Sequence, residues 1–340
     1  MNSLERVKSA LTLEQPDRVP IVEWAIHPEV VRALETGMSV EAFMARYLDG
    51  VKVKQKMLEE DCGNGAVVDE WGVKKVYSGQ MNAIPVDYPV KSPGDLKHYS
   101  PPDPLADHRL EYLKAIVNQY GGKKATIFSL NPIFTLAWSM TGMENFLISL
   151  RLEPEFADQL LKISFNFNRE LIRRAINEDA DIILFTDDFA YKTGLLMSLD
   201  DFKRFIYPYL FELVREVCDS GKLCIIHSDG KIWEIMDLLI DTGIHGINPL
   251  EPLAGMDIER AKREYGRRVC LIGNIDCGDL LSNRSPEEVK LAVRETIRKA
   301  APGGGYMMSS SNAIHASVKP ENYKAMIEAT EEYGKYPLAV

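Results

Sequence analysis

One sequence pattern recurs along the second half of the chain: a short run rich in isoleucine, valine and leucine, a polar cluster, and then a segment with helical periodicity. This alternation is typical of βα units built around a parallel sheet. Five predicted strands of this kind are 181–185, 223–226, 246–247, 269–272 and 305–308. Three earlier runs, 19–22, 66–68 and 125–128, bring the number of predicted strands to eight.

Eight strands separated by helices predict an α/β fold, a single (β/α)8 TIM barrel with its active site at the carboxyl ends of the strands. We expect one domain over residues 1–340, with residues 1–18 forming an N-terminal helix that plugs the barrel floor and residues 77–104 forming a long loop excursion. A doubly wound sheet is the architectural alternative. It is disfavoured because no glycine-rich dinucleotide turn follows Val22.

Composition narrows the class of protein. Hydrophobic residues make up 46% and charged residues 26% of the chain, as in soluble globular proteins. The net charge of −10 disfavours a nucleic-acid partner or an anionic membrane surface. No apolar window is long enough for a membrane span, no signal-like segment opens the sequence, and the five cysteines form no CxxC pair. We therefore expect a soluble cytoplasmic protein.

A histidine and two carboxylates follow neighbouring predicted strands and form the first candidate site. His227 and Asp229 stand two residues apart just beyond a strand, a spacing that suits a divalent metal. The alternative is a histidine bonded to backbone beside an aspartate that caps the next helix. Glu251, one strand later, would complete a three-ligand site with one coordination position open for substrate.

The pair Asp187 and Asp188 is the second candidate. Two adjacent carboxylates near a closed barrel top would have at least one raised pKa, which suits general acid or base catalysis. The alternative is that one carboxylate caps a turn and the other is solvated. We expect these aspartates and Asn274 to be catalytic. Further residues near strand ends are expected to bind substrate, although core packing is the alternative for most of them: Trp24, Trp71, Asn131, Phe189, Tyr191, Asn248, Met308, Asn312 and His315.

Motifs spread over nearly the whole chain point to one superfamily. They occupy 5–8 with 16–20, 69–72, 186–188, 207–209, 226–230, 246–252, 273–276, and 302–306 with 320–322. On these motifs the chain resembles the uroporphyrinogen decarboxylase superfamily, which also includes corrinoid-dependent methyltransferases. The resemblance implies the same barrel fold that the strand count predicts.

The chain departs from two branches of that superfamily, the decarboxylases and the thiol-activating methyltransferases. The decarboxylases carry an arginine-rich loop that holds the substrate carboxylates, but residues 21–28 here contain no arginine. An acidic loop without arginine would repel the carboxylates of a porphyrinogen, which disfavours that substrate. The thiol-activating methyltransferases hold zinc with His-x-Cys and a later cysteine, whereas this chain has His227-Ser228-Asp229 and Ser309-Ser310-Ser311. A metal held by oxygen-rich ligands is a better Lewis acid than a metal held by thiolates. It would suit polarisation of the oxygen of a methyl ether.

The resemblance and its departures imply a methyltransferase. We expect a methyl group to move from a small methoxylated donor, aromatic in the related enzymes, to the cobalamin of a separate corrinoid protein. In this hypothesis His227, Asp229 and Glu251 hold zinc, while an aspartate at 187 or 188 protonates the leaving oxygen. A metal-free carboxy-lyase on a smaller acid and a non-catalytic ligand-binding barrel are the alternatives. A homodimer is an alternative to a monomer.

Overall fold

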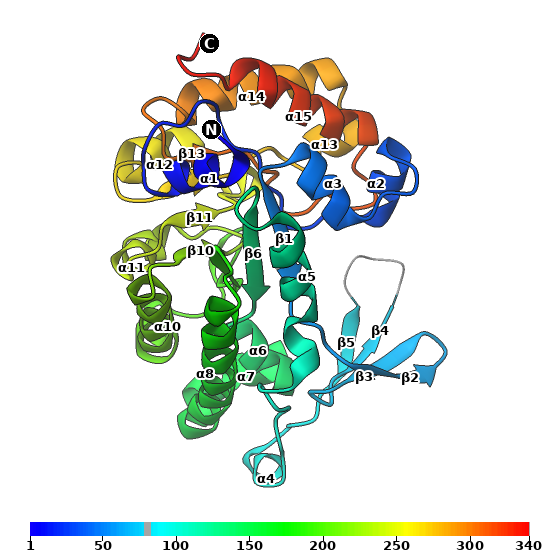
Figure 1. Ribbon diagram of the computed structural model, residues 1–340. Helices are drawn as coiled ribbons and strands as arrows, with labels where there is room; N and C mark the ends of the chain where they lie inside the picture. The colour runs from blue at the N-terminus through cyan, green and yellow to red at the C-terminus, as the bar shows by residue number, and fades with distance from the viewer. Residues whose placement is uncertain (78–82, 340) are drawn as a thin grey trace.

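The barrel is built from parallel strands in chain order. The structure, a computed structural model, describes residues 1–77 and 83–339. Seven strands pair in parallel in the order β1-β6-β7-β10-β11-β12-β13 and form a curled sheet (Figure 1). They are β1 (Gly50–Lys54), β6 (Ala125–Leu130), β7 (Ile182–Thr186), β10 (Leu223–His227), β11 (Gly246–Asn248), β12 (Cys270–Ile272) and β13 (Tyr306–Met307).

The extended segment 19–22 closes the barrel between the two ends of this sheet. On one side, the Val22 N–H donates to Met308 O and the Met308 N–H donates to Pro20 O, at 3.0 and 2.8 Å. On the other side, the Asp49 N–H donates to Ile21 O at 2.7 Å. The predicted strand at 19–22 therefore takes the eighth position, and the predicted (β/α)8 fold is confirmed.

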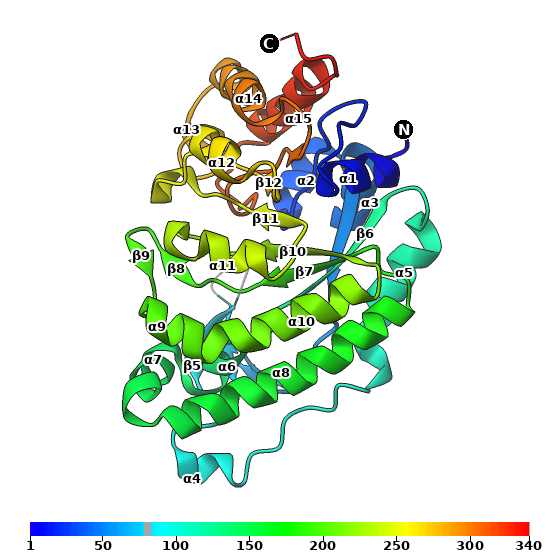
Figure 2. The same cartoon turned by 90° about the vertical axis from the view of Figure 1, so that its left-hand side faces the viewer.

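Helices cover the outside of the barrel, and Figure 2 shows α8 and α10 lying side by side there. The helices are α1 (Ser3–Leu11), α2 (Pro28–Leu34), α3 (Val40–Tyr47), α4 (Pro93–Leu96), α5 (Glu111–Tyr120), α6 (Phe134–Thr141), α7 (Met143–Leu152), α8 (Pro154–Asn177), α9 (Leu199–Asp201), α10 (Tyr207–Asp219), α11 (Met236–Asp241), α12 (Ile258–Tyr265), α13 (Leu280–Asn283), α14 (Pro286–Ala300) and α15 (Pro320–Tyr333). In the described part of the chain, none of them has both the length and the apolar composition needed to cross a membrane.

The N-terminal helix α1 plugs the barrel floor, as expected. Val7, Ala10 and Leu11 belong to a buried cluster with the inward-facing residues of the strands. A Cβ on Gly246 would lie 2.9 Å from Leu11 Cδ2, so a larger residue at this position would displace the Leu11 side chain of the plug. Alternate strand residues thus fill the barrel from below, leaving its upper end for polar side chains.

The prediction of a barrel strand at 66–68 is wrong. These residues form β3 (Ala66–Asp69) in a separate antiparallel sheet with β2 (Glu59–Gly63), β4 (Lys74–Val76) and β5 (Ile84–Asp87). The tight turn at 63–65, in which all three residues have positive φ, folds β3 back on β2. The barrel position is taken instead by β1, which the sequence analysis missed.

The predicted excursion over 77–104 contains β5 and α4, and residues 78–82 of that range lie outside the described part of the chain. Its structured parts lie toward the end of the barrel to which β6 points, opposite α1 (Figure 1). A two-stranded hairpin, β8 (Ala190–Tyr191) with β9 (Gly194–Leu195), follows β7.

Candidate functional site

The upper layer of the barrel interior is polar. Every second residue of a strand faces the barrel interior, and the lower of these residues form the buried apolar cluster. The next inward-facing residues, toward the carboxyl ends of the strands, form the layer above it. This layer contains Lys54, Ser129, Thr186, His227 and Asn248. Polar side chains at the carboxyl ends of barrel strands are positioned for chemistry.

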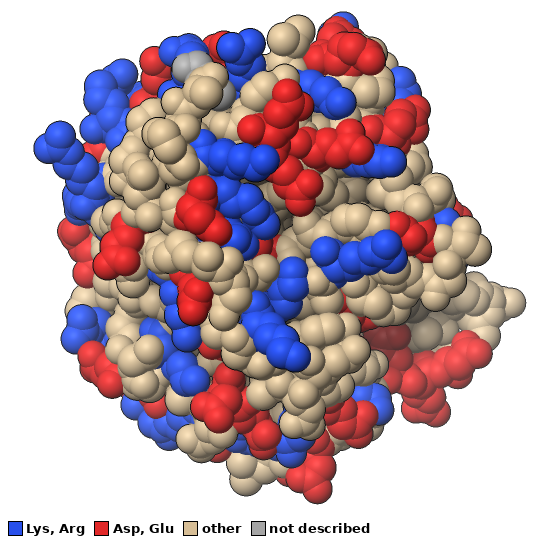
Figure 3. Space-filling model, turned by 45° about the horizontal axis from the view of Figure 1, so that its top comes forward, with Lys and Arg blue, Asp and Glu red and all other residues tan. Residues whose placement is uncertain are grey.

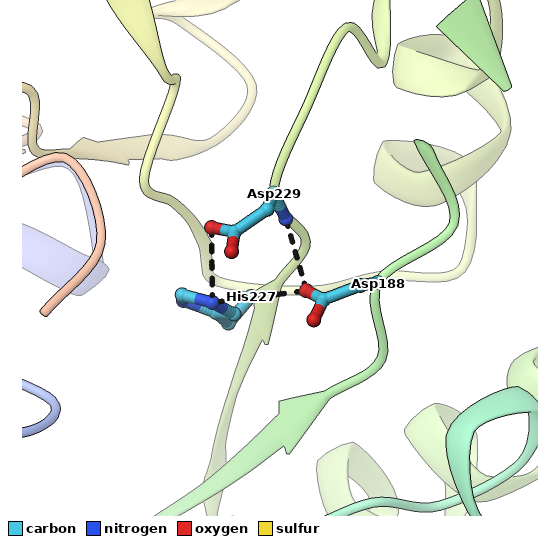
Figure 4. Close-up of side chains that lie close together, drawn as sticks. All are labelled: Asp188, His227 and Asp229. Carbon is cyan, nitrogen blue, oxygen red and sulfur yellow. Dashed lines mark hydrogen bonds and ion pairs between the residues drawn. The ribbon is translucent and has the colours of Figure 1, made fainter. Parts of the chain in front are cut away.

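Asp188, His227 and Asp229 converge at this level and form the candidate metal site (Figure 4). One potential ligand atom from each residue lies within 4.8 Å of the others. His227 Nε2 is 3.4 Å from Asp229 Oδ1 and 3.9 Å from Asp188 Oδ1. The three residues come from the ends of β7 and β10, which are neighbours in the sheet.

Neighbouring amides fix the orientation of these ligands. Asn248 Nδ2 donates to Ile272 O at 3.3 Å, so its Oδ1 faces His227 Nδ1 at 2.5 Å and accepts the proton of that nitrogen. Nε2 of His227 is therefore directed toward the two aspartates. Asn312 Nδ2 donates to Asp229 Oδ2 at 2.5 Å, and the Asp229 N–H donates to Asp188 Oδ1 at 3.1 Å.

The cluster concentrates negative charge around one imidazole. Burial opposes protonation of His227, but the carboxylates of Asp229 and Asp188 raise its pKa to about 9. Burial raises the pKa of Asp188, although the side chain keeps 52% of its surface open to solvent.

The cluster fits a divalent metal. Asp229 Oδ1 is buried and makes no hydrogen bond among the described residues, but it lies 3.4 Å from His227 Nε2, and a metal between the two atoms would replace this ion pair. One imidazole nitrogen and two carboxylates form a donor set that zinc accepts, and three protein ligands leave a position open. Asp188, His227 and Asp229 are therefore the residues that could hold an ion.

Glu251, the predicted third ligand, is not part of this cluster. Its Oε2 accepts the Gly230 N–H at 3.0 Å, which ties the carboxylate to the backbone beyond β10. Burial raises the pKa of Glu251. Asp188, which we expected to act in catalysis, occupies the third-ligand position; β7 and β11 both adjoin β10, but the Glu251 carboxylate is held by the Gly230 N–H.

Asp187 and Asn274, both predicted to be catalytic, are occupied by backbone contacts. The buried carboxylate of Asp187 accepts the N–H groups of residues 133, 134 and 135 at 2.9, 3.0 and 2.7 Å, where α6 begins. Asn274 Nδ2 donates to Leu250 O and Met256 O at 3.0 and 3.3 Å. The alternative considered for one of the paired aspartates, a capping role, therefore describes Asp187.

Of the nine predicted substrate-binding residues, the structure brings Asn248 and Asn312 into contact with the cluster. Asn131 Nδ2 donates to Thr186 O at 2.9 Å between the ends of β6 and β7. His315 Nδ1 accepts the Ser317 N–H at 3.3 Å within its own turn. Tyr191 lies on the β8–β9 hairpin with 62% of its surface exposed.

The remaining four are buried. Phe189 and Met308 pack in the larger core cluster and not in the cluster that fills the barrel interior. Trp71 packs edge-on against Phe167 of α8 at 4.6 Å, since it follows β3 of the small sheet instead of a barrel strand. Trp24 alone belongs to the buried interior cluster.

Two inward-facing lysines of β1 were missed. A Cβ on Gly50 would meet Ile127 and Val22 of the interior cluster, so Lys52 and Lys54, at the same parity, also face inward. Lys52 Nζ donates to Trp24 O at 2.5 Å. The valine–lysine alternation of 51–54 was the available signal, but such a pattern also describes a solvent-exposed strand.

Two of the three serines at 309–311 hydrogen-bond to a buried acid, Glu23. Ser309 Oγ, Ser310 Oγ and the Ser310 N–H donate to the Glu23 carboxylate at 3.3, 3.0 and 3.2 Å. Burial raises the pKa of Glu23 to about 7. Ser311 Oγ accepts the Cys277 N–H at 3.2 Å. The hydroxyl groups of Ser309 and Ser310 thus contact Glu23, whereas that of Ser311 contacts Cys277.

Comparisons with known proteins agree on the family and the fold. A family model for uroporphyrinogen decarboxylase matches residues 68–333. The uroporphyrinogen decarboxylase of Chlorobium luteolum is 28% identical over 213 residues, which are 60% of this chain and 58% of that enzyme. The enzyme of Coxiella burnetii is 25% identical over 260 residues, 72% of this chain and 68% of its own. The chain thus spans about three fifths of the first relative's length.

A solved structure extends the likeness to the whole chain. A methyltransferase from Methanosarcina mazei matches with a TM-score of 0.77 at 20% identity, covering 98% of this chain and 99% of that one. At this level of identity the match describes the fold. It includes the segment before residue 68, where the barrel is closed.

Proposed function

The chain belongs to the uroporphyrinogen decarboxylase family, and from that premise we propose that it is a methyltransferase. Its donor would be a small methoxylated compound, with an aromatic methyl ether as the leading candidate. Its acceptor would be the cobalt of a corrinoid carried by a partner protein.

The observation that carries this proposal is the cluster of one histidine and two aspartates at the barrel mouth. Asp188, His227 and Asp229 would hold a zinc ion, which would supply a Lewis acid for the oxygen of the methyl ether. Asn248 holds the His227 ring so that Nε2 faces the carboxylates, and Asn312 orients Asp229. Ligands held in this way need little rearrangement to bind an ion.

The proposed acid role is not retained for Asp187. Its two oxygens accept three backbone N–H groups, and the side chain is fully buried. In the proposal the leaving oxygen therefore departs with its charge and takes a proton from water in the open mouth. The half-exposed side chain of Asp188 indicates that water reaches this level.

Zinc analysis combined with a transfer assay tests the proposal. The wild-type protein should bind one zinc ion and methylate reduced cobalamin from at least one member of a panel of methoxybenzoates. His227→Ala and Asp229→Asn should lose both properties. Glu251→Gln is the matched control and should keep both, because Glu251 lies outside the cluster. A wild-type protein that takes up no zinc, or variants with unchanged transfer, would contradict the proposal.

Decarboxylation of a small acid is the second candidate, favoured by the names of the relatives at 25% and 28% identity. A decarboxylase without a metal would release carbon dioxide equally well after treatment with a chelator. The absence of arginine from residues 21–28 disfavours a porphyrinogen as its substrate. Carbon dioxide release that persists in His227→Ala would select this candidate.

A further inference from the structure

The inner wall of β1 presents two lysines at different depths. Both face the barrel interior, because a Cβ on Gly50, two residues before Lys52, would contact the interior residues Ile127 and Val22. Lys52 is satisfied, because it donates to Trp24 O and lies near the buried Glu23 carboxylate. Lys54, one layer nearer the mouth, has no such partner among the residues that the structure describes.

Among residues 1–77 and 83–339, the Lys54 ammonium makes no hydrogen bond, and no carboxylate lies within the 4.0 Å of an ion pair. The charged groups that act on it are Asp188 across the mouth and Lys75 of β4. Lys75 is itself paired with Asp69 at 2.5 Å. Lys54 is exposed to solvent, and the surrounding protein lowers the pKa of its ammonium by desolvation.

Lys54 and the metal cluster lie on different parts of the barrel wall. Strand order places β1 two strands from β7, which carries Asp188, and three from β10, which carries His227. A ligand between them would meet the cluster at one end and an ammonium at the other. A divalent ion at the cluster would also cancel the two aspartate charges, leaving Lys54 without a balancing charge.

We propose that Lys54 binds a carboxylate of the methyl donor, on the side of the molecule away from the methoxy group. This inference rests on the proposed function, which it deepens by naming the substrate class: methoxylated aromatic carboxylates. Lys54 would then determine specificity, since pairing with an ammonium favours the anion over a neutral analogue.

Calorimetric titration with matched ligands tests this inference. The full-length protein supplied with zinc is titrated with 3- and 4-methoxybenzoate and with the two corresponding neutral amides. At least one acid should bind about 10-fold or more tightly than its amide. Lys54→Met should abolish this preference and Lys54→Arg should keep it. Lys56→Met is the control and should also keep it, because Lys56 pairs with Glu111 outside the barrel.

The outcomes separate this inference from the proposed function. It is overturned if neither acid binds, if acid and amide bind equally, or if folded Lys54→Met retains the preference. Loss of zinc or of stability in Lys54→Met with the preference intact would show that the lysine only balances Asp188. A clear preference for the acid without methyl transfer would refute the proposed function alone. Transfer from neutral donors without preference would refute this inference alone.

Discussion

At the scale of single residues, Asn248 shows how a side chain outside the proposed ligand set can orient a ligand. Its Oδ1 faces His227 Nδ1 and its Nδ2 is held by Ile272 O. Asn248→Ala would free the imidazole to rotate, and we expect zinc affinity to fall about 10- to 100-fold. Competition with a chromophoric chelator measures this change. Asn145→Ala on α7 is the control, and equal affinities in the two variants would contradict the positioning role.

The buried carboxyl group of Glu23 should make the free energy of unfolding depend on pH. Burial raises its pKa from 4.5 to about 7, so the folded state binds this proton more strongly than the unfolded state does. The stabilisation that depends on the proton is complete below pH 4.5 and is lost as the pH rises through about 7. Glu23→Gln stays neutral and should therefore gain stability relative to the wild type, by roughly 1 to 3 kcal/mol at pH 8.

Thermal unfolding of the wild type and Glu23→Gln between pH 5 and 8 checks this expectation. The difference in Tm between the two proteins should be small at pH 5 and should grow toward pH 8. Glu29→Gln, at an exposed position, should show no such trend. A difference that is constant with pH would show that Glu23 is ionised throughout this range.

At the scale of elements, β1 is the strand that sequence analysis missed, and its first residues are held by a buried aspartate. Asp49 is fully buried and accepts from Arg6 of α1, from Arg18 and from the Ile21 N–H. One carboxylate therefore joins the floor plug, the closing segment 19–22 and β1. The sequence indicates none of these contacts, because the partners are 28 to 43 positions away from Asp49.

We expect Asp49→Asn to destabilise the protein by about 3 kcal/mol, because it leaves two arginines without their buried counter-charge. Urea unfolding measures the change as a lower transition midpoint. Asp17→Asn provides the comparison, since Asp17 also pairs with Arg6 but is 41% exposed, and its cost should stay below about 1 kcal/mol. Similar losses in the two variants would refute the distinction between the buried and the exposed pair.

At the scale of the whole molecule, the small antiparallel sheet and the barrel share one core. Trp71 beyond β3 packs on Phe167 of α8, and Glu70 pairs with the buried Arg109 at 2.7 Å. The surface carries both signs of charge interspersed, as Figure 3 shows for one face. The prediction that residues 1–340 form a single domain can be tested by unfolding experiments.

We expect the sheet and the barrel to unfold together, since separating them would expose Trp71 and leave Arg109 without its partner. Tryptophan fluorescence and far-ultraviolet circular dichroism should give coincident urea transitions. Hydrogen exchange in β3 should be as slow as in the barrel strands. Two resolved transitions, or early exchange confined to residues 59–76, would show that the sheet is a separate unit.

What the sequence determined by itself is the barrel and the location of its chemistry. Runs of branched aliphatic residues followed by polar clusters report strand periodicity, and parallel strands must bring their carboxyl ends to one rim, so His227 and Asp229 could be placed together in advance. Only the tertiary structure decided which other side chains join them. Asp188 replaces Glu251 and Lys54 enters the mouth, because strand neighbours and backbone contacts form between residues far apart in the chain. The local sequence pattern around each residue does not indicate such contacts.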